Sequence, residues 1–272
     1  MTSVQVGPRG RSRRFLIQRL NAGVSRRTPD EVAVEEAMEI RLDGVLAATT
    51  MRTPGHDYEL AAGFCFTDGL LAGAPVMVVR YCATGSAVET GFNVVTVDTG
   101  GRAPEPVARL ALTTGACGVC GSLSPTDLVA RLGPLPVVSR PGFDVLVELA
   151  ERVRPMQVLY TSTGSVHGAA ACAPTGEPLV VREDIGRHNA VDKVVGRLLL
   201  DGRLPATGLG LFVSGRAGFE LVQKAWAAGF TWMLAVGAPS SLAVETARVA
   251  GLGLAGFARG GQVNVYSPEG GW

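Results

Sequence analysis

The strand–helix–strand pattern of the main sheet is clearest in "LGLFVSGRAGFELVQKAWAAG" at residues 209–229 and in "WMLAV", which follows at 232–236. "LGLFV" and "WMLAV" are short apolar runs of the kind that forms buried strands. Between them, the glycine-containing turn "SGRAG" precedes a stretch in which apolar residues recur at helical spacing. The sequence therefore predicts a strand, a helix and a second strand here.

The same pattern occurs on both sides of this segment. On its N-terminal side, "LVV" precedes the helical stretch "EDIGRHNAVDKVVGRLLL" at 183–200, and on its C-terminal side "WMLAV" precedes "GAPSSLAVETARVAG" at 237–251. A last strand is predicted for "LGLAGF" at 252–257. Strands that alternate with helices in this way pair in parallel through right-handed crossovers. We therefore predict an α/β protein with a three-layer α/β/α sandwich.

A smaller α+β domain is predicted for residues 30–105. Alternating apolar and polar residues flank Asp43-Gly44 in "VEEAMEIRLDGVLAATTMRT", which is a strong hairpin signal. "HDYELAAGFCFTDGLL" predicts a helix, and "VMVVRY" and "FNVVTVDTG" predict two more strands. The larger α/β domain then spans residues 106–272, where "FDVLVELAERV" predicts a further helix and "VHGAAACAPTGEPLVV" a pair of strands.

Composition and charge exclude several classes of protein. The net charge of +1 gives no support for a nucleic-acid-binding protein, although residues 1–29 hold seven arginines and are interpreted as a basic, disordered tail. No apolar run approaches the ~20 residues that a membrane span requires. Five cysteines in a chain of 272 residues argue against a disulfide framework. We therefore expect a cytoplasmic protein with reduced thiols and no membrane or nucleic-acid partner.

The stretch "TTGACGVCG" at 113–121 brings two thiols, Cys117 and Cys120, into one glycine-rich loop. A structural zinc site needs a second pair of ligands at short spacing, and none follows. A thioredoxin-type disulfide needs a strand before the cysteines and a helix after them. A sulfur carrier uses every feature of the loop, because glycines let a persulfide move and the second thiol can release it. Spacing alone leaves a metal site, a redox pair, an inert turn and a sulfur carrier open.

The cysteine loop and the segments around it resemble the formate dehydrogenase accessory sulfurtransferases, the FdhD family. The resemblance covers residues 30–267. The motifs that carry it are "RTPGHDYELAAGF", "ACGVCG", "TGSVHGAA", "REDIGRHNAVDKVVG", "SGRAGFELVQKA" and "APSSLAVETA", in the family's order. The family usually has a second glycine where this chain has Ser165.

The resemblance implies a function and its residues. Such proteins accept sulfur from a cysteine desulfurase as a cysteine persulfide and pass it to the molybdenum bis-guanine-dinucleotide cofactor for apo-formate dehydrogenase. Cys117 aligns with the persulfide cysteine and Cys120 with its partner thiol. The resemblance also implies a cytidine-deaminase-like main domain, a homodimer and a contact with the guanine nucleotide moiety. That contact maps to "FARGGQ": Phe257, Ala258, Arg259, Gly260, Gly261 and Gln262.

This segment departs from the family at two positions. Gly260 and Gln262 stand where relatives have proline and arginine, so Arg259 is the only charge in "FARGGQ". In parallel sheets, ligands bind where the strands end, which here means next to Ser214, Gly237 and Phe257. Glycines there admit phosphate close to backbone amides, and Arg216 adds positive charge.

Other motif residues have less specific interpretations. We interpret Lys193 and Lys224 as solvated helix charges, and Met156 and Trp226 as core residues. His56 beside Asp57 is expected at a helix start. Three further residues stand at strand ends or strand-to-helix junctions and are open to a structural role or a role in the pocket: His167, Arg187 and His188.

Two rival functions remain beside sulfur transfer. A deaminase-like hydrolase needs cysteine ligands for zinc at the second helix start, and "SGRAGFE" has none. The other rival is a non-catalytic cofactor-binding chaperone in which the cysteine pair serves for docking, redox chemistry or metal binding.

The missing second ligand pair generates a test. We predict no permanently bound metal, so protein purified without chelator should carry well under one zinc per chain by atomic emission. Stoichiometric zinc that is lost in Cys117→Ala would replace the sulfur-carrier interpretation with a metal site.

Overall fold

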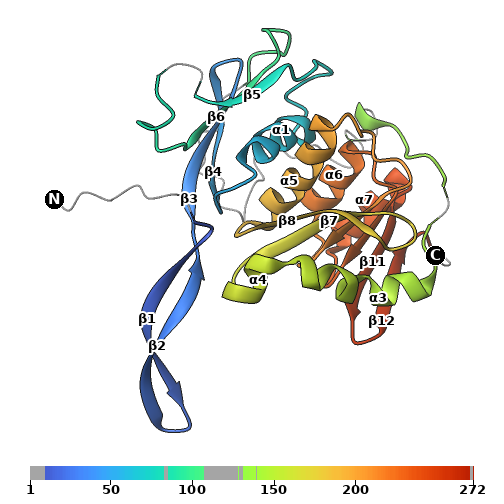
Figure 1. Cartoon of the computed structure of the whole chain (residues 1–272). Coiled ribbons are helices and arrows are strands. Elements are labelled where there is room, and N and C mark those ends of the chain that lie inside the picture. Colours follow the sequence, from blue (N-terminus) through green and yellow to red (C-terminus); the bar gives the residue numbers. More distant parts are fainter. Residues whose placement is uncertain (1–9, 83–84, 107–127, 129–130, 139, 270–271) are drawn as a thin grey trace.

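The computed structural model describes residues 10–82, 85–106, 128, 131–138, 140–269 and 272 (Figure 1). The cysteine loop with Cys117 and Cys120 lies outside these residues. The N-terminal elements are β1 (Ser12–Asn21), β2 (Val24–Ala33), β3 (Glu36–Leu42), β4 (Val45–Arg52), α1 (Asp57–Thr67), β5 (Val78–Tyr81) and β6 (Val94–Asp98). The next are α3 (Phe143–Val153), the 3₁₀ turn η1 (Arg154–Met156), α4 (Val158–Thr163), β7 (His167–Cys172), β8 (Pro178–Asp184) and α5 (Arg187–Leu200). The last are β9 (Gly210–Val213), α6 (Phe219–Ala227), β10 (Trp232–Ala235), α7 (Ser241–Ala250), β11 (Gly253–Arg259) and β12 (Gln262–Ser267).

The main sheet has six strands in the order β12-β11-β10-β9-β7-β8. β9, β10 and β11 pair in parallel, as the strand–helix alternation predicts. β7 is antiparallel to both β8 and β9, and β12 is antiparallel to β11. β8 therefore runs parallel to β9 with β7 inserted between them, and the sheet is mixed.

Helices cover both faces of this sheet (Figure 1). On one face, apolar side chains of α5, α6 and α7 pack with Val213, Met233 and Leu254 of the central strands. On the other face, α3 packs against side chains that point the opposite way, such as Phe212 and Trp232. Because both faces are buried, the central strands are apolar at every position, which is the reason for the continuous runs in the sequence.

The smaller sheet has the order β4-β3-β6-β5, and α1 packs against it. The predicted hairpin at Asp43-Gly44 is confirmed. Asp43 and Gly44 have φ of 49° and 90°, the positive values that a type I′ turn needs at both central positions. Buried Met38, Ile40 and Leu42 of β3 face the helix.

The interpretation of residues 1–29 as a disordered tail is wrong for the described part. β1 and β2, ten residues each, form an antiparallel hairpin that extends away from the rest of the molecule (Figure 1). Its turn, Ala22-Gly23, has φ of 47° and 83°. The arginine count hid the strand signal, because "RRFLIQRL" combines its basic residues with β-forming Phe15 and Ile17.

α1 and α5 join the two sheets through a contact between their backbones. A Cβ atom placed on Gly63 of α1 would lie 1.9 Å from the carbonyl oxygen of Asp192. A Cβ on Gly196 of α5 would lie 1.8 Å from the carbonyl oxygen of Glu59. Only glycine fits at either position, since real Cβ atoms do not approach an oxygen so closely.

The two lysines interpreted as solvated charges are buried, so that interpretation is wrong. Lys193 Nζ lies 2.6 Å from Asp184 Oδ2 and donates to the carbonyl of Thr53 at 2.9 Å. Lys224 Nζ contacts Asp192 Oδ1 at 2.9 Å and Asp68 Oδ1 at 3.1 Å. Burial by itself lowers the pKa of Lys224, but these carboxylates outweigh it and hold the pKa above its ordinary value. Each ammonium therefore ties α5 or α6 to the segment around α1.

Of the two residues predicted to lie in the core, Trp226 is buried and Met156 is exposed. Trp226 is 2% exposed, as predicted, and its indole N–H donates to the carbonyl of Gly133 at 2.8 Å. Met156 is 47% exposed, so its assignment to the core is wrong. It belongs to η1, a single turn at the surface beyond the end of α3.

The contact at Gly196 predicts that replacing this helical glycine with alanine destabilises the protein, although the same change usually stabilises a helix. In an isolated helix, alanine is about 1 kcal/mol more favourable than glycine. Gly196→Ala should nevertheless lower the free energy of unfolding by about 3 kcal/mol, because the new methyl meets the backbone of α1. Urea denaturation measures the difference. Gly218→Ala is the control, since its Cβ would meet no atom within 4 Å; a Gly196→Ala protein as stable as the wild type would contradict the packing.

Candidate functional site

The loops after the parallel strands meet at one edge of the main sheet. The amide of Gly237 donates to the carbonyl of Gly215 at 2.9 Å, and the amide of Phe257 donates to the carbonyl of Gly237 at 3.1 Å. Ala217 and Pro239 form an isolated parallel bridge. The predicted convergence of the loops after Ser214, Gly237 and Phe257 is therefore confirmed.

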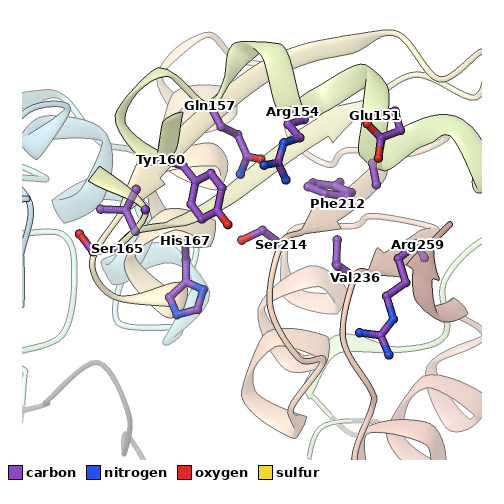
Figure 2. Close-up of a pocket in the computed structure, with 14 residues that line it drawn as sticks. Glu151, Arg154, Gln157, Tyr160, Ser165, His167, Phe212, Ser214, Val236 and Arg259 are labelled. Atoms are coloured by element: carbon purple, nitrogen blue, oxygen red, sulfur yellow. The ribbon is translucent and has the colours of Figure 1, made fainter. Parts of the chain in front are cut away.

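A cavity of about 470 Å³ opens beside this edge, on the face that carries α3 and α4 (Figure 2). Its walls come from the helical segment 150–160, the turn 164–167 and the ends of β9, β10 and β11. The lining residues are Ala150, Glu151, Arg154, Gln157, Tyr160, Gly164, Ser165, Val166, His167, Phe212, Ser214, Val236, Ala258 and Arg259.

The carboxylate of Glu183 fixes the helical wall of the cavity. This buried residue of β8 accepts hydrogen bonds from the amides of Leu159 at 2.9 Å and Tyr160 at 2.7 Å. Those amides belong to the first turn of α4 and have no partner inside the helix. A buried carboxylate there satisfies them and holds α4 against the sheet.

Figure 2 places His167 and Ser214 at the ends of neighbouring strands, with the imidazole of His167 directed away from the hydroxyl of Ser214. β7 begins at His167, and the amide of its neighbour Gly168 donates to Ser214 Oγ at 2.9 Å. Burial lowers the pKa of His167 below its ordinary value of 6.5, and the positive charge of Arg187 lowers it further. At neutral pH, His167 therefore offers a neutral imidazole to the cavity.

The rim of the cavity favours anions. Arg154 and Arg259 line it, whereas Glu151 is the one carboxylate among the described lining residues. The guanidinium of Arg154 lies 5.3 Å from the ring centre of Tyr160, which holds it over that aromatic face. Two exposed cations against one carboxylate attract a negatively charged ligand.

The predicted cofactor segment is only partly at this cavity. Ala258 and Arg259 line it, at the end of β11. Phe257 adopts a φ of 55°, and Gly260 and Gly261 form the turn to β12 with φ of 60° and 72°. Gln262 pairs with Arg259 in the β11–β12 ladder. Phe257, Gly260, Gly261 and Gln262 do not line the cavity.

Two other motif residues lie beside the cavity. His188 Nε2 is 2.9 Å from Glu220 Oε2, a contact between the first turns of α5 and α6. The hydrogen bond from His188 lowers the pKa of Glu220. Neither residue lines the cavity, and Arg216 does not either. His56 precedes α1 in the left-handed conformation, so its predicted place at a helix start is confirmed.

The sequence interpretation missed the helical wall. Arg154 belongs to η1, Tyr160 belongs to α4, and Gln157 lies between these two elements. They follow α3, which the sequence predicted from its amphipathic pattern alone. No spacing or motif in "RPMQVLY" indicates that these side chains turn toward a cavity. The one sequence signal for this wall was the motif "REDIG", because its glutamate, Glu183, binds the first turn of α4.

All three cysteines within the described residues are buried, and two of them cannot supply a thiolate at neutral pH. Cys65, Cys82 and Cys172 are free and buried. Burial raises the pKa of Cys172 to about 12 and the pKa of Cys65 still higher. Such thiols stay protonated at neutral pH, and the thiolate is the nucleophilic form. Across the described ranges, no three histidine, cysteine or acidic side chains gather as a potential metal site.

The FdhD/NarQ family model matches residues 33–271, which is most of the chain. The chain belongs to the FdhD/NarQ family. It is 46% identical over 251 residues to the sulfur carrier protein FdhD of Corynebacterium efficiens, covering 89% of this chain and 90% of that protein. The sulfur carrier protein FdhD of Nocardia farcinica is 48% identical over 262 residues, covering 94% and 92%.

A solved structure has the same fold. The crystal structure assigned to a formate dehydrogenase accessory protein from Desulfotalea psychrophila superposes with a TM-score of 0.74, covering 96% of this chain and 99% of that one. At 24% identity this likeness supports the fold alone. Within the described part of this family member, no helix combines the length and apolar character needed to cross a bilayer.

Burial of three cysteines predicts selective alkylation. Cys117 should react with iodoacetamide faster than Cys65, Cys82 or Cys172, because those three thiols are buried and burial also keeps Cys65 and Cys172 protonated. Peptide mass spectrometry after timed labelling of the native protein gives the rates. Labelling in urea is the control, since all five thiols should then react alike; equal rates in the native protein would contradict the expectation.

Proposed function

We propose that this protein is a sulfur carrier for the maturation of formate dehydrogenase. It accepts sulfur from a cysteine desulfurase as a persulfide on Cys117 and transfers it to the molybdenum bis-guanine-dinucleotide cofactor destined for apo-formate dehydrogenase. The sulfur carrier proteins FdhD that it resembles over nine-tenths of its length support the general role. The observation that carries the proposal is the anion-attracting cavity at the edge where the parallel strands end.

The two cysteines of "ACGVCG" suffice for the release of sulfur. The thiolate of Cys120 attacks Sγ of Cys117, the bond between that sulfur and the terminal sulfur breaks, and the terminal sulfur leaves as hydrosulfide. The product is a Cys117–Cys120 disulfide, so the two cysteine thiols supply the two electrons that reduce the terminal sulfur. The hydrosulfide would supply the sulfur ligand of the molybdenum; if it took the place of an oxo ligand, one proton would be taken up and the oxygen would leave as water. A dithiol reductant then restores both thiols.

The cavity suits the substrate by charge and by hydrogen bonding. The bis-guanine-dinucleotide cofactor carries several phosphates, and Arg154 and Arg259 provide the positive charge that such groups require. Ser214 accepts a hydrogen bond from Gly168 and keeps its own hydroxyl hydrogen for a ligand. His167, whose pKa is lowered by burial, is neutral at neutral pH and can accept or donate one hydrogen bond.

We also infer that residues 106–272 form a cytidine-deaminase-like domain that no longer holds catalytic zinc. The helix start "SGRAGFE" supplies glycine and arginine where a deaminase would supply cysteine ligands. We expect the protein to act as a homodimer in the cytoplasm, where thiols remain reduced.

The sulfur-transfer step has a direct readout. After incubation with a desulfurase and cysteine, intact-mass and peptide analysis should find one added sulfur on Cys117, and Cys117→Ala should abolish formate dehydrogenase maturation. Cys120→Ala should retain the persulfide but release it more slowly. Cys172→Ala is the control thiol. Wild-type protein that supports maturation and gains no sulfur would favour the non-catalytic cofactor chaperone.

The nucleotide site has a calorimetric test. GDP should bind more tightly than ADP, because polar groups that pair with the guanine edge are left unmatched against adenine. Arg259→Ala should weaken GDP about tenfold if Arg259 meets phosphate, since ~1.4 kcal/mol is a factor of ten. Arg203→Ala is the control, because Arg203 is exposed between α5 and β9. Equal affinities for GDP and ADP, or no loss with Arg259→Ala, would place the cofactor elsewhere.

A further inference from the structure

Gln157 presents to the cavity a buried hydrogen-bond donor for which the described residues supply no acceptor. The residue lies between η1 and α4, and only 5% of it is exposed. Its Nε2 is fully buried and has no hydrogen-bond partner in the described part of the chain. A buried donor without an acceptor costs about 1–3 kcal/mol. Such a group in a cavity wall indicates a ligand that supplies the acceptor.

The backbone of Gln157 is held firmly, so its side chain does not occupy this place by chance. Its amide donates to the carbonyl of Arg154 at 3.0 Å, and its carbonyl accepts from the amide and the hydroxyl of Thr161 at 3.0 Å and 2.9 Å. Glu183 anchors the following turn of α4. The side chain is thus directed toward the sheet by a fixed stretch of chain.

Gly168 of β7 makes room for this amide. A Cβ on Gly168 would lie 1.8 Å from Gln157 Nε2 and 2.8 Å from Cδ. The glycine has no positive φ, so the backbone of β7 does not require it. The amide of Gly168 also donates to Ser214 Oγ, which lines the same cavity. The absence of a side chain at Gly168 therefore places Gln157 beside the ligand-facing end of β9.

The surroundings select the kind of acceptor. Figure 2 shows the amide of Gln157 pointing into the cavity between Tyr160 and Arg154, with Arg259 across the opening. Two guanidinium groups and a neutral imidazole line the cavity beside this donor, with Glu151 as the one described carboxylate. An oxygen that bears negative charge gains most from a buried N–H in such a field.

We propose that Gln157 is a ligand-binding residue of the cavity, whose Nε2 donates a hydrogen bond to a phosphate oxygen of the bound nucleotide. Gly168 holds it there by leaving the space that its amide fills. The proposal deepens the proposed function, because it rests on a guanine nucleotide occupying this cavity. It assigns a recognition role to a residue in a stretch that carries none of the motifs.

Gln157→Met is the first test, because methionine keeps the length of the side chain and removes the donor. The dissociation constant of GDP should rise about tenfold by calorimetric titration, and that of pyrophosphate, measured by displacement of GDP, by the same factor. The midpoint of thermal unfolding without ligand should stay equal or rise, since an unsatisfied donor has been replaced by an apolar group. A merely structural glutamine would give a lower midpoint and unchanged affinity.

Gly168→Ala tests the positioning. Its methyl should displace the amide and weaken GDP to a similar extent. The double variant Gln157→Met, Gly168→Ala should then bind no more weakly than either single variant, because both remove the same hydrogen bond. Additive losses would mean that Gly168 acts by another route and would overturn its role.

The outcomes separate this inference from the proposed function. If wild-type protein does not bind GDP, the nucleotide site and this inference both fail. A second outcome would overturn this inference alone: wild-type protein binds GDP, and Arg259→Ala weakens that binding, but Gln157→Met does not. If Gln157→Met lost affinity for GDP but not for pyrophosphate, the contact would be with the base, and the assignment to phosphate would be overturned.

Discussion

The backbones of α1 and α5 touch, and this contact fixes how the small sheet and the main sheet are joined. Gly63 and Gly196 each leave room for a carbonyl oxygen of the other helix, so the two helices approach more closely than any side chain would allow. One helix covers the small sheet and the other covers the main sheet. Close approach then brings buried Lys224 within reach of Asp192 and Asp68, where the charges satisfy one another. Removing one partner of such a buried pair leaves an uncompensated charge and costs several kcal/mol.

Two adjacent acidic residues of β8 transmit this constraint to the cavity. Asp184 accepts from the amides of Thr53 and Gly186 and pairs with Lys193, which fixes the start of α5 against the small sheet. Glu183 points the other way and binds the first turn of α4. Because side chains alternate along a strand, one short segment holds a helix on each face of the sheet. The cavity wall that carries Gln157 and Tyr160 is therefore tied to the same framework as the α1–α5 contact.

The inserted strand β7 gives the site its asymmetry. In a wholly parallel sheet, the neighbour of β9 would also end at the ligand edge. Here β7 runs in the opposite direction, so its first residues, His167 and Gly168, lie at that edge instead. The first two residues of β7 therefore place the neutral imidazole of His167 and a position without a side chain, Gly168, beside Ser214. An arrangement of this kind can recognise a ligand through a few fixed donors and a charged rim, while the sulfur chemistry is proposed for Cys117 and Cys120.

Local sequence patterns were enough to predict most helices and strands, and the long motifs were enough to propose where the sulfur chemistry takes place. Apolar runs, turn glycines and helical spacing are local signals, so they predicted the Asp43-Gly44 hairpin, the β9–β11 units and the convergence of their loops. Long motifs indicated the family, and with it Cys117, Cys120 and the segment from Phe257 to Gln262. Tertiary structure alone decided which residues meet. It buried Lys193 and Lys224 by supplying distant carboxylates, and it paired the arginine-rich N-terminal strands. Of the predicted cofactor segment, it placed only Ala258 and Arg259 at the cavity. It also brought Gln157 against Gly168, because burial, charge pairing and steric fit depend on residues far apart in the chain, and no local pattern records them.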